Sequence, residues 1–226
     1  MVLQRDSSAP IWGTAAPGES ITLELNGQSV SATADAQGNW WAAFKGLAAG
    51  GPFTLGIKGS SDSVTLSNVF VGDVWLCSGQ SNMVFTLAQM GDLSKADIAA
   101  ANDPQLHWFL PANYLLPDAY QGRTWMDTTP AISGVSAVAY YFARSLRQKI
   151  NVPIGILEVA FPRSAIEGWF PPEAFDSLGM GPETKALTDE YNNLDMIGQL
   201  VQFCKNLAWV FDFGSTERLA LSQLSF

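Results

Sequence analysis

The chain is organised around one stretch, Val69-Phe70-Val71-Gly72-Asp73-Val74-Trp75-Leu76-Cys77, which is almost continuously apolar. A run of this kind predicts a β-strand that is buried on both faces, as strands of parallel sheets are. The next residues, Ser78 to Ser81, contain a glycine and predict a turn, and Met83 to Met90 can begin a helix. Strand, turn and helix in this order are typical of an α/β protein.

The sequence before this stretch predicts β-structure alone. Four segments have strand patterning, and turn residues such as Asn26-Gly27 separate them. They are Ile21–Leu25, Val30–Ala34, Trp40–Phe44 and Phe53–Ile57. Short strands at this spacing predict a small β-sandwich domain over residues 1–68, with no flexible linker between it and the next domain.

The sequence after the stretch predicts a βαβ unit. Leu106–Leu110 and Ile154–Phe161 are strand candidates. Between them, Val138 begins an apolar stripe that recurs every four residues, and Asn151 and Pro153 would stop that helix. A helix between two strands predicts parallel pairing. Beyond about residue 170 the pattern weakens, although residues 195–210 could form a helix that leads into a strand.

Composition argues against several classes of function. The 226 residues carry a formal net charge of −9 and no basic cluster, so we expect no nucleic-acid partner and no anionic membrane partner. No apolar run is long enough to span a membrane. One histidine and two cysteines without ligand spacing predict no metal, no cofactor and no disulfide framework. Met1–Arg5 lack the apolar core of a secretory signal, which leaves localisation open, as oligomeric state also is.

Ser81 carries the strongest chemical signal. It follows the predicted buried strand, so its hydroxyl is expected at the carboxyl end of that strand, where α/β sheets bind ligands. Backbone N–H groups after the turn can bind an oxyanion. The spacing alone leaves two interpretations open, a nucleophile and an ordinary helix N-cap. Met83 stands where a Gly-x-Ser-x-Gly elbow would have its second glycine.

The segment Trp75–Met83 resembles the first signature block of the sialate O-acetylesterases, a family of SGNH-type hydrolases. Further blocks resemble the same family in the same order, up to about residue 170. They are Met1–Arg5, Ile11–Gly13, Pro17–Glu19, Gly38–Trp40, Gly50–Phe53, Ser136–Arg144, Val152–Gly155 and Ile166–Trp169. Several ordered blocks are far more specific than one motif.

The resemblance implies an amino-terminal β-sandwich domain, residues 1–68, followed by a flavodoxin-like three-layer α/β/α SGNH hydrolase domain, residues 69–226. It implies hydrolysis of acetyl esters on sialic acid or other sugars. Ser81 would be the nucleophile and would place its own backbone N–H in the oxyanion hole. Gln80 and Asn82 are the implied substrate-binding candidates.

The chain departs from the family pattern in three places. Phe161–Ser164 replace the family's Trp-Gly-Gly-Thr; Pro162 has no N–H, and Arg163 is left as the second oxyanion-hole candidate, through its backbone or its guanidinium. Residues 209–215 replace the family's Trp-Tyr-Gln-Gly-Glu-Ser block. The family's Asp and His pair, the triad's acid and base, would lie beyond Phe226.

The sequence's single histidine, His107, is the remaining candidate for a general base, against the alternative of a partly exposed strand residue. We therefore expect an incomplete hydrolase domain whose segment after Pro171 is poorly ordered. Truncation, a frameshift and a genuinely short protein stay open, as do a missing leader and first strand before Met1. The alternative function is a catalytically inactive sugar-binding homologue.

Overall fold

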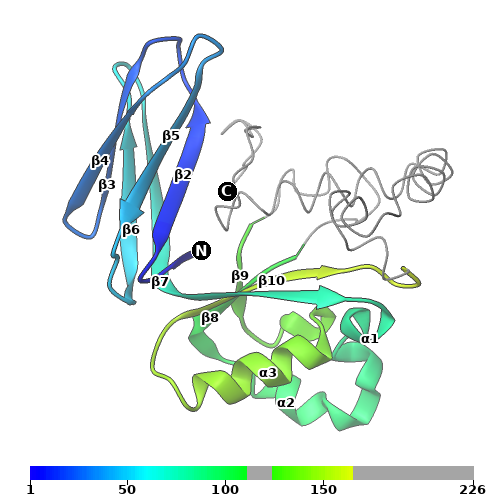
Figure 1. The fold of residues 1–226 in the computed structure, drawn as a ribbon. Coiled ribbons are helices and arrows are strands. Elements are labelled where there is room, and N and C mark those ends of the chain that lie inside the picture. The colour runs from blue at the N-terminus through cyan, green and yellow to red at the C-terminus, as the bar shows by residue number, and fades with distance from the viewer. Residues whose placement is uncertain (111–123, 165–226) are drawn as a thin grey trace, which may run out of the picture.

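The computed structural model describes residues 1–110 and 124–164. Within these ranges the protein is mixed α/β and dominated by strands (Figure 1). The strands are β1 (Val2–Gln4), β2 (Ser8–Thr14), β3 (Ser20–Leu25), β4 (Gln28–Thr33), β5 (Asn39–Lys45), β6 (Gly50–Lys58), β7 (Ser63–Gly79), β8 (Asp103–Phe109), β9 (Met126–Thr128) and β10 (Ile154–Ala160). The α-helices are α1 (Ser81–Val84), α2 (Lys95–Ala99) and α3 (Ala137–Arg147), and 3₁₀ turns span Ala88–Leu93 and Ile132–Gly134.

The first six strands confirm the β-structure predicted before residue 68. β3 pairs antiparallel with β4 and β6, while β2 and β5 form a separate two-stranded sheet. Asn26 and Gly27 both adopt positive φ, 47° and 76°, as the tight turn between β3 and β4 requires. One hydrophobic cluster takes buried residues from both sheets, among them Trp40 and Phe44 of β5 and Leu23 of β3. β2 was not predicted.

β7 joins the two parts of the described chain. Its first half pairs antiparallel with β6, and residues Asp73–Gly79 pair in parallel with β10. One sheet therefore runs through the order β4-β3-β6-β7-β10-β8-β9, with β1 also paired to β7. The boundary predicted at residue 68 falls inside this continuous strand, which Figure 1 shows passing from the upper strands to the lower sheet.

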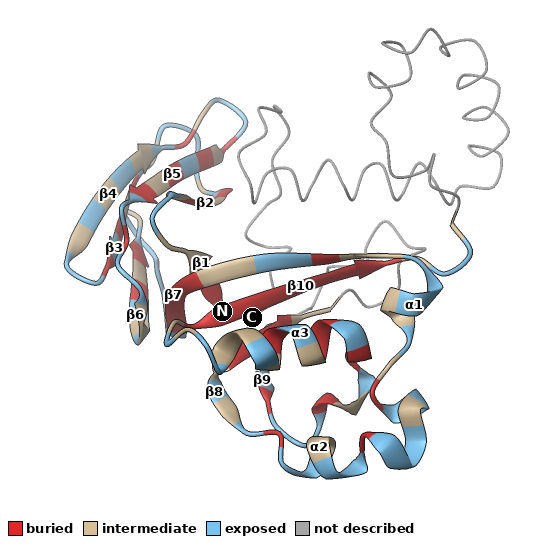
Figure 2. Ribbon diagram, turned by 60° about the horizontal axis from the view of Figure 1, so that its bottom comes forward, coloured by how far each residue is buried: buried red, intermediate tan, exposed pale blue. Residues whose placement is uncertain are grey.

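The predicted βαβ unit is confirmed. β8 and β10 pair in parallel, and α3 lies between them in sequence and covers one face of the sheet. Ser136 caps α3, because its side chain accepts a hydrogen bond from the Ala139 N–H, and Arg144 and Arg147 lie in the last turn, where positive charge is favourable. All seven residues of β10 are buried, as Figure 2 shows in red.

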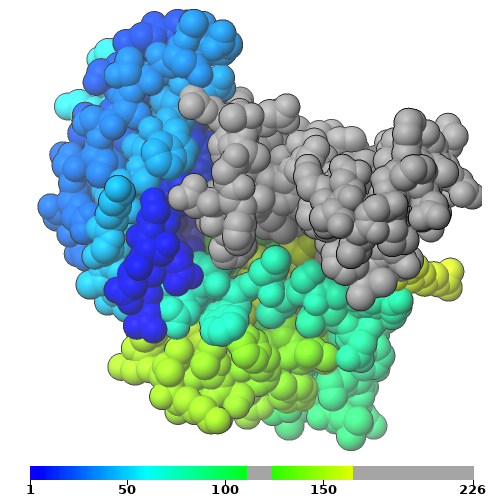
Figure 3. Space-filling view, viewed as in Figure 1, coloured from blue at the N-terminus to red at the C-terminus, as the bar shows by residue number. Residues whose placement is uncertain are grey.

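Two details of the prediction are wrong. The stretch Val69–Cys77 is not buried throughout, since Trp75 and Leu76 are 42% and 43% exposed. Among the described residues, Asp73–Gly79 of β7 pair with β10 alone, so this part of the strand lies at an edge of the described sheet. The α3 stripe is also part surface: Phe142 is 39% exposed and packs edge-to-face on Trp75, with ring centroids 5.2 Å apart. Figure 3 shows turquoise β7 atoms at the surface beside the yellow-green atoms of α3.

The predicted helix from Met83 to Met90 is broken in two. α1 ends at Val84, and the following 3₁₀ turn contains Gly91 with a positive φ of 62°. Backbone bonds join this connection to the start of α3: Ala137 N–H donates to the Phe85 carbonyl at 2.9 Å, and Leu87 N–H to the Val135 carbonyl at 3.0 Å. The segment therefore takes a path set by its contacts with neighbouring segments and does not continue as a regular helix.

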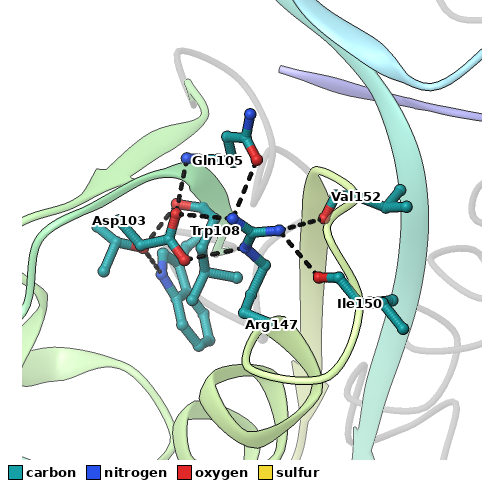
Figure 4. Close-up of polar contacts among 8 residues, drawn as sticks. Asp103, Gln105, Trp108, Arg147, Ile150 and Val152 are labelled. Atoms are coloured by element: carbon teal, nitrogen blue, oxygen red, sulfur yellow. Dashed lines mark hydrogen bonds and ion pairs between the residues drawn. The ribbon is translucent and has the colours of Figure 1, made fainter.

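Arg147 fixes the far end of the βαβ unit (Figure 4). Its guanidinium donates to both carboxylate oxygens of Asp103 and to Gln105 Oε1 on β8, at 2.9–3.4 Å. It also donates to the carbonyls of Ile150 and Val152 in the connection to β10, at 3.3 and 2.7 Å. One side chain thus ties α3, β8 and the start of β10 together.

Several predictions concern residues outside the described ranges. They are the family-like block Ile166–Trp169, the helix and strand expected over residues 195–210, the altered block at residues 209–215, and the poor order expected after Pro171. Over residues 1–110 and 124–164, no helix has the length and apolarity needed to cross a membrane.

Candidate functional site

The turn after β7 places Ser81 as the sequence predicted. β7 ends at Gly79, Gln80 is the N-cap, and Ser81 is the first residue of α1. A Cβ at position 79 would lie only 3.2 Å from the Cβ of Met83, so the strand can turn this tightly because residue 79 is glycine. The N-cap interpretation of Ser81 is wrong, since the Gln80 side chain caps the helix and leaves the Ser81 hydroxyl free of that role.

A second loop, residues 161–164 after β10, meets this turn. Phe161 N–H donates to the Gly79 carbonyl at 2.9 Å, which continues the parallel pairing of β10 with β7. Gln80 Nε2 donates to the Ser164 carbonyl at 3.2 Å, and Arg163 N–H donates to Ser81 Oγ at 3.4 Å. The structure therefore brings Arg163 close to Gln80 and Ser81, from which it is more than 80 residues away in sequence.

The backbone N–H of Ser81 already has an acceptor. It donates to Oε1 of Gln80 at 3.2 Å, and the same Gln80 side chain donates to the second loop. An oxyanion could use the Ser81 N–H only after displacing that amide oxygen. The Gln80 side chain thus occupies the position that an oxyanion would take. Asn82 is exposed at the start of α1.

Arg163 adopts an unusual backbone conformation. Its φ is +65°, in the left-handed region that glycine enters freely and other residues enter at a cost of about 1–2 kcal/mol. In this conformation the Arg163 N–H donates to Ser81 Oγ at 3.4 Å. The guanidinium is exposed and forms no ion pair with the described residues.

A buried carboxylate lies behind the turn, and the sequence analysis missed it. Glu158 is 4% exposed, and its Oε2 accepts a hydrogen bond from the Ser136 N–H at 2.9 Å. Burial raises the pKa of Glu158 to about 7, against the partly compensating hydrogen bond from Ser136. Burial and the nearby Glu158 raise the pKa of the Cys77 thiol to about 11. One acidic residue inside the otherwise apolar Ile154–Phe161 was the available signal.

His107 is at the wrong end of the sheet to act on Ser81. It lies in register with Gly155 of β10, whereas Gly79 lies in register with Ala160. Five residues of strand separate the two levels, about 16 Å at roughly 3.3 Å per residue. The candidate general base is therefore not brought to the nucleophile.

His107 is also buried rather than partly exposed. Only 1% of it is accessible, its ring lies 4.5 Å from the ring of Phe70, and Nδ1 is 3.0 Å from Oδ1 of Asp127. Nε2 is buried and has no hydrogen-bond partner among the described residues, and burial lowers the pKa of His107 below its ordinary value. Its environment favours the neutral ring and gives it a packing role.

No other site competes with the turn at Ser81 in the described part of the chain. Nowhere in that part do three or more His, Cys, Asp or Glu side chains gather to hold a metal ion. A shallow groove between residues 16–24 and 58–60 has no aromatic side chain for a sugar to stack on. Glu19 is committed there to structure, since it accepts from Ser60 N–H and Oγ–H at 2.7 Å.

Comparison with known proteins gives a consistent result. The chain is 30% identical to the sialate O-acetylesterase of Mus musculus and 29% identical to that of Homo sapiens, over 85% and 80% of its own length. A crystal structure of a carbohydrate acetylesterase from Xanthomonas citri superposes with a TM-score of 0.70 at 38% identity, over 79% of this chain. No protein-family model matches the chain.

The shared part is less than half of each relative. The chain spans 41% of the mouse protein, 39% of the human protein and 41% of the Xanthomonas chain. The identities and the superposition apply to that part alone. The resemblance to the sialate O-acetylesterases is confirmed, and the chain is a homologue of part of these proteins.

Proposed function

We propose that the chain is a carbohydrate O-acetylesterase of the sialate O-acetylesterase type, which hydrolyses acetyl esters on sialic acid or another sugar. The observation that carries the proposal is the approach of two loops at the end of β7 and β10, where Arg163 N–H lies 3.4 Å from Ser81 Oγ. The mouse, human and Xanthomonas relatives, each named as an acetylesterase, support the reaction class.

In this proposal residues 1–68 form an amino-terminal β-sandwich domain. Residues 69–226 belong to a flavodoxin-like three-layer α/β/α SGNH hydrolase domain. The single hydrophobic cluster shared by the β2–β5 and β3–β4–β6 strands supports the first assignment. The parallel order β7-β10-β8 with α3 on one face supports the second.

Ser81 is the nucleophile of the proposed reaction. Its Oγ attacks the acetyl carbonyl carbon, the sugar oxygen leaves with a proton, and water then cleaves the acetyl–serine ester. The backbone N–H groups of Ser81 and Arg163 are the oxyanion donors, and each lost donor costs about 10²–10³ in rate. Gln80 must swing away from the Ser81 N–H to admit the oxyanion, after which it and Asn82 can bind the sugar.

The proposed reaction also requires a general base. Serine needs a neighbouring group that takes its proton, and the described residues bring no histidine to Ser81. This favours the second candidate function, a catalytically inactive sugar-binding homologue that keeps the turn. Removal of triad members from serine hydrolases leaves only about 10³–10⁴ over the uncatalysed rate.

One experiment separates the two functions. The 226-residue chain and its Ser81→Ala variant are assayed on an aryl acetate, and acetylated and deacetylated sialic acid are titrated into both by NMR. Weak or absent hydrolysis with saturable, acetyl-dependent binding supports the inactive homologue. Hydrolysis at an ordinary esterase rate that Ser81→Ala abolishes supports the complete enzyme. If the chain shows no hydrolysis and no binding, both functions are overturned.

A further inference from the structure

Glu158 lies at the root of the candidate nucleophile turn. It occupies the face of β10 that α3 covers, in register with Cys77 of β7, two residues before the level at which Gly79 pairs with Ala160. A carboxylate is expensive to bury unless hydrogen bonds compensate it. Among the described residues the bond from Ser136 N–H, at 2.9 Å, is the compensation shown for it. A lone buried carboxylate beside a candidate site calls for a role.

A short chain of contacts joins Glu158 to Ser81. Ser136, whose N–H donates to Glu158, directs its hydroxyl at Met83 Sδ, 3.2 Å away. Met83 belongs to the same four-residue helix as Ser81, and its Cβ is the atom that closes on Gly79. The backbone bonds from Ala137 to Phe85 hold the two segments in the same register. A displacement of Ser136 is therefore expected to displace the helix that contains Ser81.

We propose that Glu158 is a positioning residue for Ser81, which holds the nucleophile turn through Ser136 and Met83 and loosens it when it takes up a proton. The inference deepens the proposed function and rests on it for the meaning of Ser81. A charged acceptor binds an N–H more strongly than a neutral one, so protonation weakens the bond to Ser136. It also adds a buried O–H donor that needs an acceptor.

The surroundings allow Glu158 to titrate near neutral pH. Burial raises its pKa to about 7, and no cation among the described residues opposes that shift. Across the sheet the facing ionisable group is the Cys77 thiol, whose pKa is raised to about 11, so it stays neutral in this range. α1 has no ionisable side chain.

The remaining neighbours are committed elsewhere. The Tyr140 hydroxyl on α3 donates to the Asp97 carbonyl. Of the ionisable residues on β8, Asp103 is paired with Arg147, and His107 alternates with Trp108, which packs on α3, so His107 points to the opposite face. Among the described residues of this neighbourhood, Glu158 is therefore the group that changes charge between pH 5.5 and 8.5.

The test follows three NMR signals of the full 226-residue chain from pH 5.5 to 8.5: the Ser136 amide, the Met83 methyl and the Ser81 amide. All three are expected to shift with one common midpoint near pH 7. Glu158→Gln, which resembles the protonated state, should abolish the titration of all three. Glu24→Gln, at an exposed carboxylate of β3, is the matched control and should leave all three unchanged.

A second variant keeps the proposal falsifiable if Glu158→Gln does not fold. Met83→Leu removes the sulfur acceptor and keeps an apolar side chain, so the Ser136 amide should still titrate while the Ser81 amide loses at least half of its shift. A Ser136 amide that does not titrate, or a Ser81 amide that stays flat in the unmodified protein, would overturn the proposal. So would a Ser81 titration that survives Glu158→Gln or is undiminished in Met83→Leu.

These readings do not depend on turnover, so they can be separated from the proposed function. Common titration with no ester hydrolysis would leave Glu158 as the positioning residue of an inactive turn. Hydrolysis without common titration would support the proposed function and reject the role of Glu158. If the chain hydrolyses an aryl acetate, its rate should also rise with pH about a midpoint near 7, and Glu158→Gln should remove that step.

Discussion

The two hydrophobic clusters of the described molecule differ in the polar groups buried around them. Both clusters consist of hydrophobic residues, but the described residues before position 90, which include the whole first cluster, contain no buried polar or charged residue. Every buried polar or charged residue in the described ranges lies after position 90, in the part built on β8, β9, α3 and β10. These residues are Ser94, His107, Thr128, Ser136 and Glu158. The described chain after position 90 thus carries desolvation costs that the part around the first cluster avoids.

This difference distinguishes a part of the molecule with an apolar core from a part whose buried polar groups can support a chemical role. An apolar core tolerates repacking as long as volume is kept, whereas a buried polar group requires its partner in place. The two polar groups nearest the Ser81 turn, Ser136 and Glu158, are bonded to each other. His107, at the other end of the sheet, has one nitrogen without a hydrogen-bond partner among the described residues. Two of the five buried polar residues therefore lie beside the proposed site, and the others lie away from it.

The largest effects are expected from emptying either core. Trp108→Ala should lower the free energy of unfolding by about 3–5 kcal/mol, as large-to-small core changes do. Trp108 is fully buried, and its indole N–H also donates to Thr128 Oγ1 at 2.8 Å. Phe44→Ala, at an equally buried position of the first cluster, should cost a similar amount through the cavity alone.

Trp108→Phe separates the polar part of that loss. It keeps an aromatic ring and removes the donor, so it should cost about 1 kcal/mol plus the lost volume. Urea denaturation followed by fluorescence and circular dichroism measures all three variants. If Trp108→Phe were no more destabilising than a conservative change in the first cluster, the two cores would not differ as described.

The next largest effect is a dependence of the unfolding free energy on pH that comes from Glu158. Glu158 has a folded pKa of about 7 against an ordinary value of 4.5, so the folded state binds its proton more tightly. Its contribution to stability is complete below pH 4.5 and is lost as the pH rises toward 7, by about 3 kcal/mol in total. The difference in unfolding free energy between the unmodified protein and Glu158→Gln, measured from pH 4.5 to 7.5, should follow this curve.

His107 acts in the opposite direction and provides the internal check. Its folded pKa is lowered, so the stability that it contributes is present above pH 6.5 and is lost as the pH falls. Glu158→Gln should leave this acid limb in place. A pH profile that Glu158→Gln does not change would show that Glu158 is charged in both states at neutral pH.

A smaller loss is expected when the Arg147 fork is removed. Arg147→Ala leaves Asp103, Gln105 and two carbonyls without their half-buried donor and should cost about 2 kcal/mol. Arg147→Lys should recover part of it, because an ammonium keeps the charge but lacks the planar fork. Lys95→Ala, at an exposed pair with Asp92, should show no measurable loss in the same denaturation assay and is the control.

The smallest effect concerns the backbone at Arg163. Arg163→Gly should raise the free energy of unfolding by up to about 1 kcal/mol, since glycine relieves the cost of a positive φ. The greater freedom of glycine in the unfolded chain opposes part of that gain. Arg163→Ala keeps the unfavourable φ and should bring no gain. Equal stabilisation by both variants would assign the effect to the side chain instead.

The local patterns of the sequence account for much of the fold. Alternation predicted β3 to β6, the glycine after Cys77 predicted the turn at Ser81, and the four-residue stripe predicted α3. β2 was missed because Pro10 and Gly13 interrupt its pattern, and β9 because three residues show no period. The spatial order, with β8 beside β10 and not beside β7, depends on packing that no local pattern records.

The candidate site could be predicted only at positions where a single residue gives a signal in the sequence. Ser81 and Arg163 were found because one follows a glycine turn and the other replaces a glycine, and the structure brings them together. The occupation of the Ser81 N–H by Gln80 is a side-chain rotamer, which sequence does not specify. The burial of His107 depends on Phe70 and Asp127, both distant in the chain. Glu158 gave a signal, a charge inside an apolar strand, that was not used.

The continuity of β7 has a consequence for dissection of the protein. Its 17 residues serve the antiparallel strands at one end and the parallel strands at the other, so a cut at residue 68 would divide a single strand between two fragments. The amino-terminal fragment would lose the Val69 and Val71 side chains from its core, and the start of β6, Gly50–Phe53, would lose its partners on β7. The shortest autonomous amino-terminal piece should extend through Gly72, and the two halves should unfold as one cooperative unit.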